Sequence, residues 1–192
     1  MLKKILFFCV SIFISLSSNA TNSNFNYSYI QLNHAKINED NKFKENSFNL
    51  SKSINNSMFF TSSYSQGEFY LDSTETHSYS IGLGSNIGIN EVTDMVFSFQ
   101  LAKGIEKNRL LEMEIDQDTL NASIEIKHII LNNLEVSGAI NYSNFAMIDN
   151  GSGHDLSYDF GISWTINESL SLISGVSHND SNSINIGIEM GL

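Results

Sequence analysis

The chain contains no proline and a single cysteine, and only 10 of its 192 residues are basic. Without a second thiol it can form neither an internal disulfide nor a thiol-bound zinc site. Its 21 acidic residues give a formal charge of −11, which repels phosphate and argues against nucleic acid as a partner. Charged residues are also scarce, at 16% against roughly 25% in soluble domains. At 41% hydrophobic content, the chain is apolar enough to form one folded domain.

The first twenty residues are typical of a secretory signal peptide. Two lysines precede an apolar run from Ile5 to Leu16, and small residues lead up to Ala20. The run is about twelve residues long, whereas a transmembrane helix needs about twenty. We expect cleavage after Ala20, which removes Cys9 and leaves 8 bases and 21 acids in a domain spanning residues 21–192.

Beyond residue 20 the dominant pattern is alternation of large and small side chains. From Leu156 to Ile166, six large apolar or aromatic residues occupy every second position, with small or polar residues between them. A helix would scatter these six side chains, but a strand places all six on one face. The same pattern recurs at 78–84, 95–101, 120–126, 134–142 and 184–192. Weaker candidates lie at 25–36, 43–54, 58–67 and 170–178, which brings the expected number of strands to ten, with eight as the alternative.

The connections between these strands alternate in length. Four tight joints share an asparagine signature and start 35, 42 and 35 residues apart: Ile54-Asn55-Asn56, Ile89-Asn90-Glu91, Leu131-Asn132-Asn133 and Ile166-Asn167-Glu168. Asparagine suits turns because it tolerates left-handed backbone. Longer polar loops are expected near 37–42, 68–76, 104–118, 148–153 and 179–182. This connectivity predicts up-and-down hairpins with short turns at one end and longer loops at the other, as in a membrane barrel.

The composition of the second face favours a membrane over water. A soluble sandwich or lipocalin-like barrel would carry Lys and Glu opposite its apolar face, but these strands carry mostly Ser, Gly, Asn and Thr there. Such residues suit a narrow polar lumen, and the large apolar residues suit lipid. We therefore predict an all-β fold, a closed antiparallel up-and-down transmembrane β-barrel.

Aromatic residues near strand ends are expected to form girdles at the membrane interfaces. The candidates are Phe25, Tyr27, Phe43, Tyr142 and Trp164. The facing of the first strand stays open, because Tyr27 and Tyr29 occupy one parity while Ile30 and Leu32 occupy the other.

At this point the chain resembles the small outer-membrane β-barrel proteins of Gram-negative bacteria, namely an OmpA-type or porin-like barrel without a periplasmic domain. Family members end in a strand that the barrel assembly machinery reads, and this chain matches that signal at Asn185, Gly187 and Met190. It departs at Leu192, where the family prefers Phe or Trp. The resemblance implies a monomer without cofactor in the outer membrane, surrounded by lipid and lipopolysaccharide.

Five charged residues fall on the inward parity: Glu125, Lys127, Glu135, Asp159 and Glu189. Lys52 is assigned to the same face. Unpaired charges are costly in a low-dielectric interior, so the acids are expected to gather around Lys127. A barrel of eight to ten strands is filled largely by its own side chains, which argues against a general diffusion pore. The cluster is then either a structural plug or the lining of a narrow cation path.

The loop expected at 104–118 carries four acids, Glu112, Glu114, Asp116 and Asp118, at alternate positions. An extended backbone would hold all four carboxylates on one side, where they repel unless solvated or bridged by a cation. The sequence lacks the glycine of a calcium-binding loop. We predict a solvated acidic surface, with a divalent-cation site bridging to lipopolysaccharide phosphates as the alternative.

No catalytic constellation stands out among the five histidines. Omptin-type proteases use Asp-any-His, and barrel-type lipid A deacylases use a His followed two residues later by Ser; neither order occurs at His34, His77, His128, His154 or His178. We expect a non-enzymatic barrel that presents short acidic loops in a structural or surface-interaction role. The alternative is a narrow, porin-like channel for small solutes or ions.

The fold and the location are testable together. We expect the protein to fractionate with outer membranes and to run faster on a gel when unheated, because a closed barrel resists detergent until it is boiled. Unchanged mobility combined with a soluble fraction would contradict both expectations.

Overall fold

The computed structural model describes the chain over residues 25–37, 43–69, 74–108, 110–111, 113–147, 151–179 and 181–192. The expected signal peptide and Glu112 lie outside these ranges. No helix within them is long and apolar enough to cross a membrane.

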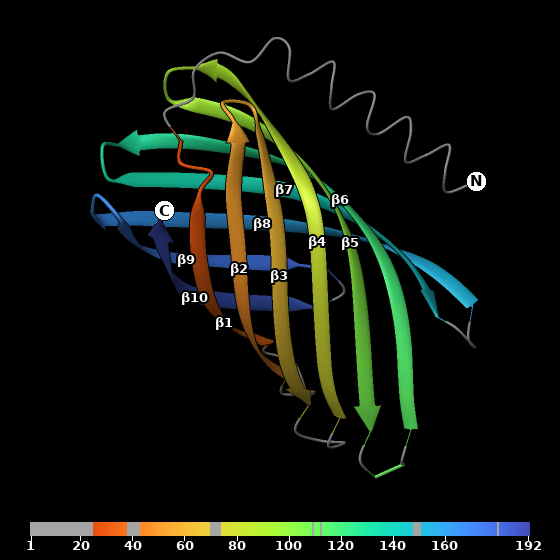
Figure 1. Cartoon of the computed structure of the whole chain (residues 1–192). Coiled ribbons are helices and arrows are strands. Elements are labelled where there is room, and N and C mark those ends of the chain that lie inside the picture. Colours follow the sequence, from red (N-terminus) through yellow and green to blue (C-terminus); the bar gives the residue numbers. More distant parts are fainter. Residues whose placement is uncertain are drawn as a thin grey trace, which may run out of the picture.

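Ten antiparallel strands close into one barrel, as Figure 1 shows. They are β1 (Tyr29–Ile37), β2 (Phe43–Asn55), β3 (Met58–Phe69), β4 (Thr74–Asn90), β5 (Thr93–Asn108), β6 (Met113–Leu131), β7 (Leu134–Met147), β8 (Gly151–Asn167), β9 (Leu170–His178) and β10 (Asn182–Gly191). Each strand pairs with its neighbours in sequence, and β1 pairs with β10 from Tyr29↔Gly191 to Ile37↔Ser183. The predicted fold class and the count of ten strands are confirmed.

Asparagine side chains shape three of the four tight turns. Oδ1 of Asn55, Asn90 and Asn167 each accepts a hydrogen bond from the backbone N–H two residues later, at 2.9–3.0 Å. This Asx turn satisfies an amide that the tight connection would leave unpaired. At the fourth turn the equivalent position is Leu131, which pairs with Leu134. We call the end that carries these turns the short-turn end and the opposite one the long-loop end.

The outer surface of the barrel is apolar on every strand. The six alternating large residues of β8, from Leu156 to Ile166, are 44–54% exposed. At roughly 3.3 Å per residue and a tilt of about 40°, that run covers about 25 Å, the height of the apolar band of a membrane barrel. One exposed apolar residue from each strand marks this belt: Leu32, Phe48, Phe60, Leu83, Leu101, Ile124, Ile140, Phe160, Val176 and Ile186. Only lipid can cover such a continuous surface.

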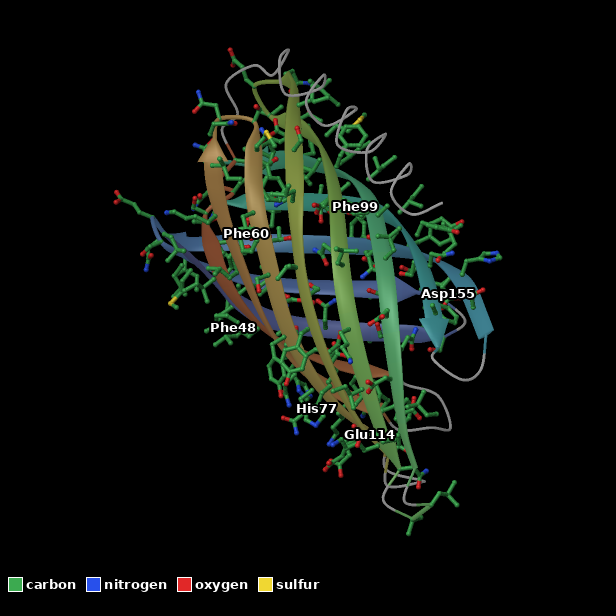
Figure 2. All side chains as sticks on the ribbon, turned by 45° about the vertical axis from the view of Figure 1, so that its right-hand side comes forward. Phe48, Phe60, His77, Phe99, Glu114 and Asp155 are labelled. Carbon is green, nitrogen blue, oxygen red and sulfur yellow. The ribbon has the colours of Figure 1, made fainter. Side chains whose placement is uncertain are left out.

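Charged and polar side chains mark where the belt ends. In Figure 2, Phe48, Phe60 and Phe99 lie along the wall, and His77 and Glu114 lie nearer the long loops. Tyr142 and Trp164 are exposed on the outer face, as the girdle prediction expects.

Three other girdle predictions are wrong. Phe25 and Tyr27 are buried inside the short-turn end, and Phe43 packs against Phe69 with ring centroids 4.4 Å apart, above Gly67. An aromatic residue near a strand end can cover the mouth of a lumen as well as meet the headgroups, and sequence does not distinguish the two. Figure 1 places the start of the described chain at the short-turn end.

The structure also settles the facing of β1 and corrects that of Lys52. Tyr29 lines the interior, whereas Leu32 is exposed outside. Lys52 is opposite Phe60 in the β2–β3 ladder and shares its exposed outer face. The register, which sequence does not show, decides both placements.

The loop expected at 104–118 is mostly strand. β5 continues to Asn108 and β6 begins at Met113. Lys103 Nζ lies 2.9 Å from Asp116 Oδ2, and Lys107 Nζ lies 3.2 Å from Glu114 Oε2. These cross-strand pairs offset the repulsion among the acids and extend the hairpin.

The apolar belt predicts a depth-dependent cost for charge. Phe160→Arg, near the middle of β8, should lower the free energy of unfolding by about 2–4 kcal/mol, while Leu156→Arg, opposite Tyr142 near the belt's edge, should cost about 0–1 kcal/mol. Denaturant titration in lipid vesicles measures both. Equal effects at the two depths would contradict the assigned membrane position.

Candidate functional site

On one side of the lumen, hydroxyl and amide groups bond to one another across neighbouring strands. Oγ of Ser63 lies 2.6 Å from that of Ser80, and the Ser98 and Ser123 hydroxyls are equally close. Ser80 also donates to the Gln100 side chain at 3.2 Å. These bonds link β3, β4, β5 and β6 across their inner faces and leave little unpaired polarity on that side.

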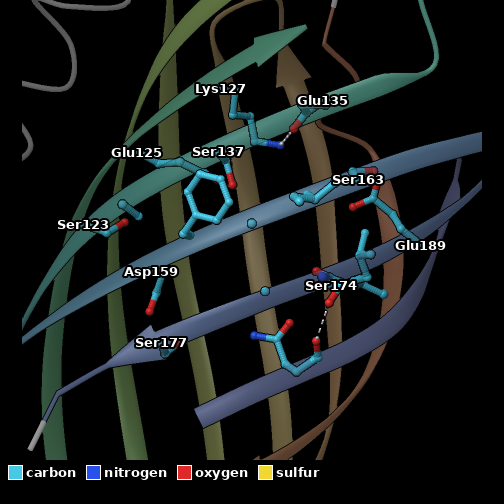
Figure 3. Close-up of a pocket in the computed structure, with 18 of the residues that line it drawn as sticks. Ser123, Glu125, Lys127, Glu135, Ser137, Asp159, Ser163, Ser174, Ser177 and Glu189 are labelled. Carbon is cyan, nitrogen blue, oxygen red and sulfur yellow. Dashed lines mark hydrogen bonds and ion pairs between the residues drawn. The ribbon is translucent and has the colours of Figure 1, made fainter. Parts of the chain in front are cut away.

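The other side contains a charged cavity. Its volume is about 290 Å³, enough for about ten water molecules. Its walls come from β1 and from β6 to β10, and Figure 3 shows its lining. All five charges assigned to the lumen from sequence line this one cavity: Glu125, Lys127, Glu135, Asp159 and Glu189. Four carboxylates therefore face a single ammonium group.

The ammonium group is held at one end of the cavity. Lys127 Nζ lies 3.0 Å from Glu135 Oε1, the contact marked in Figure 3. It also lies 5.7 Å from the ring centroid of Tyr27, close enough for a cation–π contact. The side chains of Lys127 and Glu135 are only 16% and 26% exposed. In such a partly desolvated place the attraction between the two charges is strong, and removing the Lys127 ammonium group leaves the carboxylates of the cavity without a counter-charge.

Two of the acids flank Ala139 of β7. Glu125 and Asp159 both stand opposite Ala139 of β7, on its two neighbouring strands. Two strand spacings separate them by about 10 Å, and the small alanine leaves the space between them open. Asp159 Oδ2 accepts a hydrogen bond of 2.6 Å from Asn141. The two carboxylates can therefore hold water or a small cation between them without contacting each other.

A second cavity of about 190 Å³ lies at the short-turn end. Four residues line both cavities, namely Lys127, Glu135, Ser163 and Glu189. We call these four residues the neck, because the two cavities meet there. A solute moving along the lumen between the cavities must pass the ion pair.

The chain before β1 occupies the short-turn mouth. We call Phe25–Ser28 the plug. Phe25 and Tyr27 are only 9% and 6% exposed, and they pack in one cluster with Phe59 and Val96. Burial of each such side chain contributes about 1.5–3 kcal/mol. Phe25 and its neighbour Asn26 also line the second cavity.

Tyr27 is fixed by directional contacts as well. Its ring stacks on Phe59 at a centroid distance of 5.0 Å and an angle of 11°. Its hydroxyl donates a hydrogen bond of 2.8 Å to Asp94, and its backbone carbonyl accepts one of 2.8 Å from Ser51. Gly84 makes this arrangement possible, because a Cβ there would collide with the Phe59 ring.

Sequence reasoning missed Asp94 as an interior charge. The residue is fully buried and lies on the inward parity of β5, directly before the alternating run 95–101. Continuing the alternation of that run by one residue would have predicted that Asp94 points inward. Its contact with Tyr27 could not be predicted, because the two residues are 67 positions apart in the sequence.

The predicted acidic surface lies on the outside of the barrel, away from the cavity. Glu114 and Asp116 pair with lysines of β5, and Asp118 is exposed on the same face opposite Lys103. Among the described residues no group of three or more acids, histidines or cysteines is placed to hold a metal ion. Glu112 is outside those residues.

The five histidines also face outward. Three contact polar neighbours through Nδ1: His34 with Asn46, His128 with Thr93, and His178 with Asn182, at 2.8–2.9 Å. Nδ1 of His77 lies 3.2 Å from the Tyr64 hydroxyl, and His154 stacks on Tyr142. Each ring therefore contacts a neighbouring side chain on the outer wall, and none lines the charged cavity.

The terminal strand places its four signal residues on both faces. Asn185 lines the cavity, and Gly187 faces inward where a Cβ would meet the backbone of Leu32 and Asn33. Met190 and Leu192 are exposed outside. The Leu192 N–H donates to the Ser28 carbonyl at 2.8 Å, which continues the β1–β10 ladder.

Comparison with known proteins shows the fold. The chain is similar to the KdgM porin, at 11% identity and a TM-score of 0.55 over 85% of this chain and 99% of that one. It is also similar to the NanC porin, at 7% identity and a TM-score of 0.55 over 85% and 100%. The β domain of the Bordetella autotransporter BrkA has a TM-score of 0.52 at 6% identity, over 86% and 98%. No family model and no curated protein matches the sequence. The fold is that of outer-membrane β-barrels.

The neck predicts strong coupling between its two charges. Lys127→Met alone should destabilise the barrel more than the Lys127→Met/Glu135→Gln double variant does, because it leaves four carboxylates in the cavity without an ammonium group, whereas the double variant leaves three. A double-mutant cycle by denaturant unfolding should give a coupling free energy of roughly 0.5–3 kcal/mol. Additive effects would show that the pair contributes nothing.

Proposed function

We propose that the protein is a non-enzymatic outer-membrane channel of narrow bore, for small cations and small neutral polar solutes. The observation that supports this most directly is the cavity in which four carboxylates and one ammonium group line the lumen. A ring of acids raises the local concentration of cations and excludes anions. We therefore propose a conducting channel in preference to the structural or surface-interaction role that the sequence favoured.

The similarity to porins supports a channel function, but it does not identify the solute. One KdgM porin structure holds disordered oligogalacturonate, which is a polyanion. The lumen of this chain has the opposite charge requirement, because an anion entering it meets an excess of three carboxylates. We therefore infer that acidic oligosaccharides are not its solutes.

The proposal includes the cellular location and the processing of the chain. The chain is exported, loses residues 1–20 and works as a monomer in the outer membrane. The finer OmpA-type resemblance stays a prediction. A role at the cell surface is a second candidate, supported by the charged β5–β6 hairpin, where Lys103, Lys107, Glu114 and Asp116 form two ion pairs outside the lumen.

The proposal is tested by electrical recording. Purified protein in a planar bilayer under a KCl gradient should give unitary steps whose reversal potential indicates preference for K⁺ over Cl⁻. Asp159→Asn and Glu189→Gln should each shift that potential toward zero, because each removes a carboxylate from the cavity lining.

Asp155→Asn is the matched control. Asp155 is on β8, as Asp159 is, but it does not line the cavity, and its carboxylate accepts a hydrogen bond from Asn179. Its replacement should leave the reversal potential unchanged. A silent bilayer with correctly folded protein would overturn the channel, and selectivity for Cl⁻ would overturn its cation preference.

A further inference from the structure

The plug lies at the mouth toward which the charged lumen leads. The neck connects the main cavity to the second cavity, and Phe25 and Asn26 form part of the wall of that second cavity. Any path through the neck to the short-turn end therefore runs against the plug.

The seat that receives the plug differs from the rest of the lumen. Most inward positions of β3 to β5 carry hydroxyl or amide groups, as in the bonded set Ser63, Ser80, Ser98 and Gln100. At the short-turn end Phe59 and Val96 form an apolar patch instead, covered by Phe25 and Tyr27. Such a patch would be exposed to water in the lumen if the plug were absent.

The plug is linked directly to the neck. Lys127 contacts the Tyr27 ring on one side and Glu135 on the other. Moving Tyr27 away would remove one contact of the only ammonium group that lines the main cavity. The position of the plug and the state of the ion pair are thus coupled.

The plug is attached to the barrel at Ser28. The Ser28 carbonyl accepts from Leu192 at 2.8 Å, and its hydroxyl accepts from the Ser53 N–H at 3.0 Å. Phe25 and Tyr27 pack on Phe59 and Val96, and Tyr27 is held further by its hydrogen bonds to the side chains of Asp94 and Ser51, neither of which belongs to the β1–β10 ladder. Undocking would therefore expose two aromatic side chains without breaking the β1 ladder.

We propose that Phe25–Tyr27 is a tethered gate. When it is docked against Phe59, Val96 and Asp94, it closes the short-turn mouth. When it leaves this seat, a path opens from the neck to the mouth, and small cations pass. This inference rests on the proposed channel function and adds the regulation of the same lumen.

Loss of the contacts that hold the plug in its seat should open the gate. The Phe25→Ala/Tyr27→Ala double variant removes the packed surface and should raise the open fraction in planar bilayers by about tenfold or more. Tyr27→Phe keeps the stacking but loses the bond to Asp94, and it should give a smaller rise. Tyr158→Ala, which removes one tyrosine side chain from the outer face, where Tyr158 is exposed, should leave the open fraction unchanged.

A disulfide should hold the gate shut. A Cβ built on Gly191 would lie 2.9 Å from the side-chain nitrogen of Asn26, so Asn26→Cys/Gly191→Cys brings two thiols within bridging reach. Oxidation should abolish openings, and reductant should restore them. The Asn26→Cys single variant is the control, and heat-modifiable mobility shows that each variant is folded.

The possible outcomes separate the gate from the channel. An increased open fraction with unchanged step size, together with closure on oxidation, supports the gate. A changed step size with unchanged dwell times overturns it, since the plug would then be a fixed constriction. If neither the alanine double variant nor the disulfide changes the open fraction, the gate is overturned and the channel is not. Folded protein that is silent even without the two aromatic side chains overturns the channel itself.

Discussion

A peptide group in hydrocarbon has no water to bond to, and the rest of this structure depends on that constraint. Ten strands satisfy it because β1 pairs with β10 and no edge is left open. Closure then separates the side chains into two environments. The outer face has to be apolar around the whole circumference, and the inner face has to be polar and self-satisfied, which is why the lumen contains bonded serines on one side and an ion pair on the other.

The two sides of the lumen have different tasks. On β3 to β5 the inner wall carries mostly uncharged side chains and provides the seat for Tyr27 through Phe59, Val96 and Asp94. On β6 to β10 it carries the carboxylates that line the cavity. Lys127 belongs to β6, at the boundary between these sides, and contacts both the plug and the acids. The acids that line the cavity and the plug therefore meet at one residue.

Sequence predicted the parts of the structure that depend on period two. The facing of Phe160 and of Glu125 follows from alternation along one strand, and both were readable. Contacts between strands were not readable, because they depend on register. Asp116 appeared to belong to a loop, since its partner Lys103 lies on another strand. Tyr27 was assigned to a girdle because its partner Asp94 is distant in the chain. Local pattern gives the direction of a side chain, and tertiary packing decides what it meets.

The β1–β10 seam has a consequence for how the barrel forms. Every other pairing is a hairpin between consecutive strands, so it closes a short loop at low entropic cost, whereas the seam joins the two most distant strands and is therefore expected to form last. The seat of Tyr27 belongs to β3, β5 and β6 and is complete before that final step. Docking of Tyr27 at this stage draws β1 across the unfinished cylinder, which reduces the conformational search that its free edge must make to reach β10.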